Sequence, residues 1–210
     1  MPHVRSLALL SALPTLAPPV SVARQTPTAE LGVWTAASVG NSQLLGGTRD
    51  RSVVQVGLRF ARLLVAGHAA SLFYFADALP VQLFRQPAYT RCFADGVEQR
   101  CQEGRETVYG VGLNPIGLKL ELFSRGRWRP FVASSAGILI SARPVPVDSI
   151  GGTRFNFALD AQAGLSYYSS SSRRSITVGY KYLHISNGDI SRFNPGLDVH
   201  MLFAGYSWSR

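Results

Sequence analysis

The sequence predicts an all-β fold in which eight antiparallel strands close into a transmembrane barrel of the bacterial outer membrane. Three observations support this prediction. Apolar and polar residues alternate with a period of two along several long segments. The connections between these segments are alternately long and short, as in outer-membrane barrels. The chain also begins with an apolar segment of the kind found in exported proteins.

Residues 1–23 have the features of a secretory signal peptide. One cation, Arg5, precedes the mostly apolar segment 6–20, and Ser21-Val22-Ala23 supplies small residues where a signal peptidase would cleave. A buried N-terminal helix is the alternative interpretation of this segment. We expect cleavage after Ala23, which leaves residues 24–210 as a single β-barrel domain.

The composition narrows the class of partner. Lysine and arginine exceed aspartate and glutamate, so the formal net charge is +9. This charge implies an acidic partner, either nucleic acid or an anionic membrane surface. Because an exported protein seldom meets nucleic acid, we expect the membrane surface and no nucleic acid. Outside the N-terminus no apolar run approaches ~18 residues, which excludes a helical membrane protein.

The clearest alternation lies in residues 153–167. Its odd positions are apolar from Phe155 to Leu165, whereas its even positions are polar or small and include Asp160 and Gln162. A strand of this length exceeds the usual ~5–6 residues and suits a membrane barrel, whose strands need ~9–11. A soluble β-sandwich is the alternative, but it would turn the apolar face inward and would not need aromatic ends.

Seven further segments show the same alternation, in part more weakly, and bring the expected number of strands to eight. These segments cover about 30–40, 54–60, 67–76, 109–122, 128–141, 176–182 and 197–208. Within 109–122 the apolar parity changes at Asn114-Pro115, where we expect a β-bulge. The long external loops are expected at about 41–51, 77–106, 142–152 and 187–196, and the short internal turns near 63–66, 124–127 and 169–174.

An eight-stranded barrel is filled by its own side chains rather than by water. Several charged or amide residues fall on the polar faces of the expected strands. They are Arg59, Lys119, Glu121, Asp160, Gln162 and Lys181. Because an unpaired buried charge is costly, we expect these side chains to form a paired network. A packed interior of this kind argues against a diffusion channel.

Cys92 and Cys101 lie nine residues apart in a polar stretch of the chain. In an oxidising compartment, such a pair most simply forms a disulfide within a loop. A metal site would need more ligands than these two, and no other cysteine or histidine lies near them in the sequence. We therefore expect a disulfide rather than a metal site.

The candidate catalytic residues lie where the seventh strand meets the last external loop. His184 and Ser186 continue the apolar, lipid-facing row of residues 176–182. Residues two apart on a strand point the same way, with backbones about 6.6–6.8 Å apart. Asp198 begins the next strand on the same face and could orient His184, which completes a set of nucleophile, base and acid for acyl transfer. The alternative is ordinary hydrogen bonding at the membrane interface.

These residues resemble the signature of the lipid A 3-O-deacylases. The resemblance is carried by His184-x-Ser186-Asn187, by Asn194-Pro195-Gly196 and by the acid at Asp198, and is strongest over about 180–206. It implies that Ser186 is the nucleophile, His184 the base and Asp198 the orienting acid. It also implies that Asn187 and Asn194 stabilise the oxyanion. The family usually has glutamate where this chain has Asp198, so the orienting arm here is one methylene shorter.

The resemblance implies hydrolysis of the ester-linked 3-hydroxyacyl chain at the 3-position of lipid A in the outer leaflet. The substrate would be lipopolysaccharide, and no cofactor is implied. Basic loop residues could meet its phosphates: Arg49, Arg51, Arg91, Arg154 and Arg192. Two alternatives stay open, namely a non-catalytic barrel with a structural or adhesive role and another outer-membrane acyl-transfer enzyme. The sequence also leaves open a monomer or a homodimer.

Overall fold

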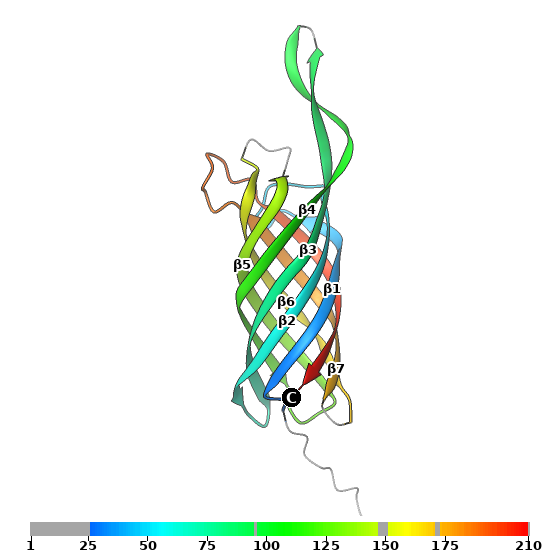
Figure 1. Ribbon diagram of the computed structural model, residues 1–210, viewed down its shortest axis with the longest axis vertical. Helices are drawn as coiled ribbons and strands as arrows, with labels where there is room; N and C mark the ends of the chain where they lie inside the picture. Colours follow the sequence, from blue (N-terminus) through cyan, green and yellow to red (C-terminus); the bar gives the residue numbers. More distant parts are fainter. Residues whose placement is uncertain (1–25, 95, 147–150, 171–172, 210) are drawn as a thin grey trace, which may run out of the picture.

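The computed structural model describes residues 26–94, 96–146, 151–170 and 173–209. In it, eight antiparallel strands form a closed barrel, because each strand pairs with the next and β1 pairs with β8 (Figure 1). The strands are β1 (Ala29–Ser42), β2 (Ser52–Ala66), β3 (Ala70–Ala94), β4 (Val97–Leu122), β5 (Trp128–Val145), β6 (Thr153–Tyr168), β7 (Arg174–Ser186) and β8 (Leu197–Ser209). The expected signal peptide, residues 1–23, lies outside the described residues. Within those residues, no helix is long and apolar enough to cross a membrane.

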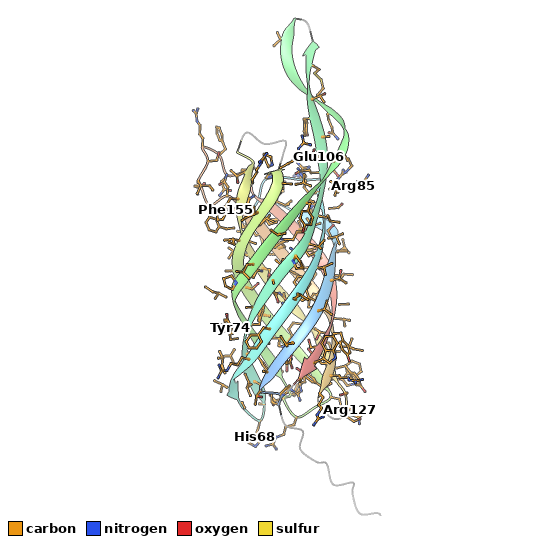
Figure 2. All side chains as sticks on the ribbon, viewed as in Figure 1. His68, Tyr74, Arg85, Glu106, Arg127 and Phe155 are labelled. Atoms are coloured by element: carbon orange, nitrogen blue, oxygen red, sulfur yellow. A yellow bond between two sulfur atoms is a disulfide. The ribbon has the colours of Figure 1, made fainter. Side chains whose placement is uncertain are left out.

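The period-two alternation sorts side chains between the two faces of the barrel wall. On β6 the odd-numbered Phe155, Phe157 and Leu159 are 37–50% exposed on the outside, whereas Asp160 and Gln162 are buried inside. Figure 2 shows Phe155 projecting away from the barrel. An apolar exterior and a polar interior are what a strand between lipid and a packed lumen requires. The predicted barrel and the predicted orientation of its faces are therefore confirmed.

The interior is a network of paired charges, as the sequence predicted. The guanidinium of Arg59 donates two hydrogen bonds of 2.7 Å to the carboxylate of Asp77. Lys119 pairs with Glu121 at 2.9 Å, and Lys181 lies 3.2 Å from the carboxylate of Asp160. Since these side chains fill the lumen, the barrel has a packed interior and does not form a pore.

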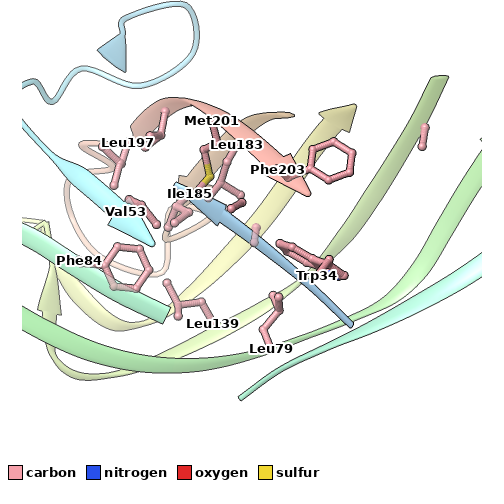
Figure 3. Close-up of a cluster of buried hydrophobic side chains, with 14 of the residues drawn as sticks. Trp34, Val53, Leu79, Phe84, Leu139, Leu183, Ile185, Leu197, Met201 and Phe203 are labelled. Carbon is pink, nitrogen blue, oxygen red and sulfur yellow. The ribbon is translucent and has the colours of Figure 1, made fainter. Parts of the chain in front are cut away.

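An apolar cluster fills the lumen behind the end of β7 and the beginning of β8 (Figure 3). Leu183 and Ile185 from β7 and Leu197 and Val199 from β8 are each no more than 1% exposed and point inward. The same two strands carry polar side chains on their outer face at this height. The cluster therefore gives these outward-pointing groups a rigid support.

The structure corrects the prediction of a long loop over 77–106. β3 and β4 instead stay paired as far as Ala94 and Val97, and this hairpin projects beyond the rim of the barrel (Figure 1). Figure 2 places Arg85 and Glu106 at its base. The projecting part of the hairpin contacts neither lipid nor the barrel core, so neither of its faces has to be apolar. Its sequence therefore lacks the alternation of apolar and polar residues by which the other strands were recognised.

Smaller features of the hairpin and turns follow the sequence more closely. Cys92 and Cys101 form the predicted disulfide, with their Cα atoms 5.8 Å apart. The register of β4 against β5 shifts between Leu113 and Ile116, which confirms the predicted bulge. β2 continues to Ala66, so the first short turn covers residues 67–69 rather than 63–66.

Candidate active site

The candidate site lies on the outer face of the barrel, where β7 ends and β8 begins. His184 and Ser186 have the outward parity of β7, because Lys181, Leu183 and Ile185 between and before them point inward. In the register of β7 against β8, His184 lies directly opposite Asp198. Directly opposed residues of an antiparallel pair have Cβ atoms about 4.5–5.5 Å apart, which is within reach of a histidine and an aspartate.

His184 and Asp198 are joined by a hydrogen bond of 2.7 Å between Nδ1 and Oδ1. Asp198 is fully buried and His184 is only 9% exposed, so the pair is shielded from bulk solvent. A carboxylate at this distance favours the tautomer with the proton on Nδ1. The other ring nitrogen, Nε2, is then free to accept a proton from a neighbouring group.

The second oxygen of Asp198 is held by the first external loop, residues 43–51, here called loop 1. The backbone N–H groups of Leu45 and Gly46 donate to Oδ2 over 2.7 and 2.9 Å. This contact was not predictable from the sequence, because backbone amides leave no pattern in residue type. At the far end of loop 1, the Arg105 guanidinium donates to Asp50, and this hydrogen bond lowers the pKa of the Asp50 carboxyl.

Ser186 is partly exposed, two residues beyond His184 on the same face of β7. Within the part of the chain that the structure describes, no group hydrogen-bonds its hydroxyl. Its cross-strand partner on β6 is Phe157, and the partner of His184 is Leu159. The serine hydroxyl therefore faces the membrane side of the barrel at the border of an apolar surface.

That apolar surface is hollowed into a groove of about 460 Å³ over β4, β5 and β6. Its walls are almost entirely apolar and include Phe157 and Leu159, the partners of Ser186 and His184. The full lining is Leu113, Pro115, Ile116, Ala136, Gly137, Ile138, Phe157, Ala158 and Leu159. The groove thus extends sideways from the candidate catalytic residues across the lipid-facing wall.

Asn187 organises the last external loop, residues 187–196, here called loop 4. Its amide nitrogen donates to the carbonyls of Gly151 and Phe193, each over 2.8 Å, and its side-chain oxygen accepts from the N–H of Asp189. The side chain is only 2% exposed. Both N–H donors of this amide are therefore committed to backbone carbonyls, and Asn187 ties loop 4 to the loop between β5 and β6.

Asn194 is placed differently, because it is exposed and only its oxygen is engaged. The side-chain Oδ1 accepts a hydrogen bond of 3.1 Å from the backbone N–H of Asn187. This bond fixes the orientation of the amide and turns its NH₂ group away from the N–H of Asn187. Within the described residues, that NH₂ group has no hydrogen-bond partner.

The basic residues expected at the external rim fall into two kinds. Arg51 is 4% exposed and its guanidinium donates to the carbonyls of Arg49 and Asp50, so it stabilises loop 1 from within. Arg154 and Arg192 are exposed, and Arg192 stacks on Phe193. The side chain of Arg91 lies outside the described part of the chain. In that part, no group of three or more histidine, cysteine or acidic side chains could hold a metal ion.

The candidate site lies in a part of the chain that matches a known protein family. A family model described as lipid A 3-O-deacylase (PagL) matches residues 93–207, more than half of the chain. The crystal structure of the outer membrane enzyme PagL aligns at 18% identity with a TM-score of 0.60, over 83% of this chain and 97% of that one. This likeness supports the barrel fold.

Neisserial surface protein A aligns over 87% of this chain and 97% of its own, at 13% identity and a TM-score of 0.47. No curated protein sequence matches the chain. His184, Ser186 and Asp198 all lie within the residues matched by the family model, whereas loop 1 lies outside them.

Proposed function

This chain belongs to the lipid A 3-O-deacylase (PagL) family, and we propose that it hydrolyses the ester at the 3-position of lipid A with Ser186 as nucleophile. Membership of the family makes the protein a lipid A deacylase, an ester hydrolase of the bacterial outer membrane that acts on lipopolysaccharide. The position of the ester, the serine mechanism and the residues that perform it are our proposal.

The observation that carries the proposal is the hydrogen bond between His184 and Asp198 on the lipid-facing surface. His184 lies two residues before Ser186 on the same strand face. A buried acid and histidine on the outside of a membrane barrel are costly unless they serve a purpose. With Asp198 holding the Nδ1 proton, His184 Nε2 can take the proton of the Ser186 hydroxyl. This is the division of roles used by serine hydrolases on unrelated folds.

The reaction then runs in two steps. Ser186 Oγ attacks the ester carbonyl of the 3-linked acyl chain while His184 accepts its proton, and collapse of the tetrahedral intermediate releases the sugar 3-hydroxyl, which takes that proton. Water, deprotonated by His184, hydrolyses the acyl-enzyme and releases a 3-hydroxy fatty acid. No other reactant is needed.

One feature of loop 4 supports stabilisation of the oxyanion. The NH₂ group of Asn194 is free and oriented by the hydrogen bond to its oxygen, so we assign it as a donor together with backbone N–H groups of the loop. Asn187 was expected as a second donor from the sequence. Because both of its N–H groups are engaged, we assign it the task of holding the loop in place.

The apolar groove beside the catalytic residues suits an acyl chain of the substrate. It is open to the lipid side, it is lined by apolar side chains, and it starts at the residues paired with Ser186 and His184. A chain that lies there would exchange contact with lipid for contact with protein. Exposed arginines such as Arg154 and Arg192 are near enough to the external rim to meet lipid A phosphates.

Mass spectrometry of lipid A from Gram-negative cells that express the protein tests this proposal. We expect the loss of one 3-hydroxyacyl chain, and Ser186→Ala should abolish it while the barrel still shows heat-modifiable migration on a gel. Ser134→Ala, another outward-facing serine, is the matched control and should leave the deacylation intact. A gain of an acyl chain would indicate an acyltransferase instead, and unchanged lipid A would favour a structural barrel.

A further inference from the structure

We propose that loop 1 is a positioning element of the active site, which holds Asp198 in the orientation that His184 requires. This inference rests on the proposed function, because it concerns how the acid of the triad is fixed. The contact comes from a segment 153 residues away in the sequence, outside the region that the family model matches. It is therefore a property of this chain that the family match does not convey.

The two oxygens of Asp198 have separate partners. Oδ1 faces His184 Nδ1, and Oδ2 accepts from the N–H groups of Leu45 and Gly46. Hydrogen bonds to a charged carboxylate are shorter and stronger than neutral ones. Because a rotation of the carboxylate would break the bonds to loop 1, these two amides lock the plane in which Oδ1 meets the imidazole.

Loop 1 is held against the end of loop 4 and the start of β8 by a row of hydrogen bonds. The N–H of Gly47 donates to the carbonyl of Pro195 at 2.7 Å, and the hydroxyl of Thr48 donates to the carbonyl of Gly196 at 2.6 Å. Thr48 also forms a parallel bridge with Leu197. These bonds hold the backbone of loop 1 against the residues that immediately precede Asp198.

This close seating depends on two glycines that face each other. A Cβ atom on Gly46 would lie 2.6 Å from the carbonyl carbon of Gly196 and 2.7 Å from the nitrogen of Leu197. A Cβ atom on Gly196 would in turn lie 2.7 Å from the Cα of Gly46. The obstacles are backbone atoms, so a side chain at position 46 can be accommodated only if loop 1 moves away from Asp198.

A loop that merely covers Asp198 would protect the site but would not act through the carboxylate. The two roles differ in a double-mutant cycle. If loop 1 acts through Asp198, then disturbing loop 1 should have no further effect once the carboxylate is gone. If loop 1 only contributes to the general stability of the external rim, its effect should be the same with or without Asp198.

The test is Gly46→Ala, with Gly40→Ala as matched control, because a Cβ atom at position 40 meets no atom closer than 4.0 Å. Initial rates of deacylation of purified lipid A in detergent micelles give kcat and KM. We expect kcat to fall roughly 10- to 100-fold in Gly46→Ala with little change in KM, as for a charge-assisted hydrogen bond lost from the triad. Gly40→Ala should equal the wild type, and Gly46→Ala should add nothing in an Asp198→Ala background.

Two further measurements keep the result interpretable. Thr48→Val removes a bond that seats loop 1 without adding bulk, and it should lower kcat in the same direction. By NMR, the downfield Nδ1–H signal of His184, identified by its absence in Asp198→Ala, should persist in Gly40→Ala and be lost in Gly46→Ala. Heat-modifiable migration on a gel reports whether each barrel has folded.

The proposal is overturned if folded Gly46→Ala keeps the wild-type kcat and the downfield signal. It is equally overturned if the change lowers kcat by the same factor with and without Asp198. Failure of the proposed function would look different, since the wild type would then leave lipid A unchanged or add an acyl chain, or Ser186→Ala would remain active, whatever happened at loop 1.

Discussion

Asp198 is the residue on which the geometry of the site converges. Its carboxylate has no exposure and accepts hydrogen bonds from three groups on two elements. An acid one methylene longer would start from the same Cα opposite His184 but would need more room than this pocket offers. The fit of Asp198 is therefore set by the position of loop 1, whose backbone amides hold its Oδ2.

The first residue-scale prediction follows from this fit. Asp198→Glu keeps the charge, yet the added methylene overpacks a fully buried position and should cost about 1–3 kcal/mol of local strain. We expect the deacylation rate to fall at least tenfold, with the loop displaced as judged by faster proteolysis within residues 43–51. A glutamate variant as active as the wild type would show that loop 1 does not constrain the acid.

The two asparagines of loop 4 are assigned different roles, Asn194 in catalysis and Asn187 in holding the loop. Asn194→Ala removes the unengaged NH₂ group together with one hydrogen bond from the loop backbone. It should lower kcat about 100-fold or more, as loss of an oxyanion donor does, with much less effect on proteolysis of the loop than Asn187→Ala. Asn187→Ala removes three hydrogen bonds made by a buried side chain and should lower kcat while also making loop 4 more susceptible to protease. If both variants behave alike in proteolysis, the assignment of separate roles is wrong.

At the scale of elements, the projecting hairpin of β3 and β4 is separate from the site. Its disulfide joins Cys92 to Cys101 near the tip, whereas the candidate catalytic residues lie on β7 and β8 (Figure 1). Among the described residues, the base of the hairpin reaches loop 1 through the Arg105–Asp50 pair, which is solvent-exposed and contributes little.

We accordingly predict that replacing both cysteines by serine leaves deacylation within about twofold of the wild type. The nine-residue separation closes only a short loop, so the crosslink constrains the hairpin tip and little else. Lipid A mass spectrometry measures the activity, and limited proteolysis should detect the freed tip. A large loss of activity in a folded double variant would mean that the hairpin contributes to substrate binding.

The stability of the whole molecule depends on a lumen in which oppositely charged side chains are paired. Asp77 is completely buried, and its two oxygens both accept from Arg59. Removal of one partner from a buried pair leaves the other without compensation, which typically costs 3–5 kcal/mol. The pair lies within the barrel wall, away from the external rim, so its loss should affect stability rather than the chemistry of the site.

The prediction at this scale is that Arg59→Met lowers the free energy of unfolding by about 3–5 kcal/mol, measured by urea titration in detergent or lipid vesicles. Arg62→Met, an exposed arginine on the same strand, is the control and should change it by less than about 0.5 kcal/mol. The double variant Arg59→Met, Asp77→Leu should recover most of the loss. Equal destabilisation by both single variants would argue against the network.

The sequence predicted correctly those features that depend on neighbouring residues of one strand. The alternation around Phe155 and Asp160 assigned the faces of β6 correctly, and the parity change at Asn114-Pro115 located a bulge. The same parity put His184 and Ser186 on the lipid-facing side. The loop predicted over 77–106 was wrong, because two strands that leave the membrane pair with each other without a lipid-facing side to mark them.

What the sequence alone determined, then, is which face of the wall each side chain occupies, since successive residues of a strand point to opposite sides whatever surrounds them. Only the tertiary structure decided which residues of different strands meet. Closure of the barrel between β1 and β8 brings loop 1 onto Asp198, and the register of β7 against β8 sets His184 opposite that acid. The contact of loop 1 joins the amide of Leu45 to a side chain 153 residues away, and no pattern of residue types records it, whereas strand parity had already placed Asp198 on the same face as His184.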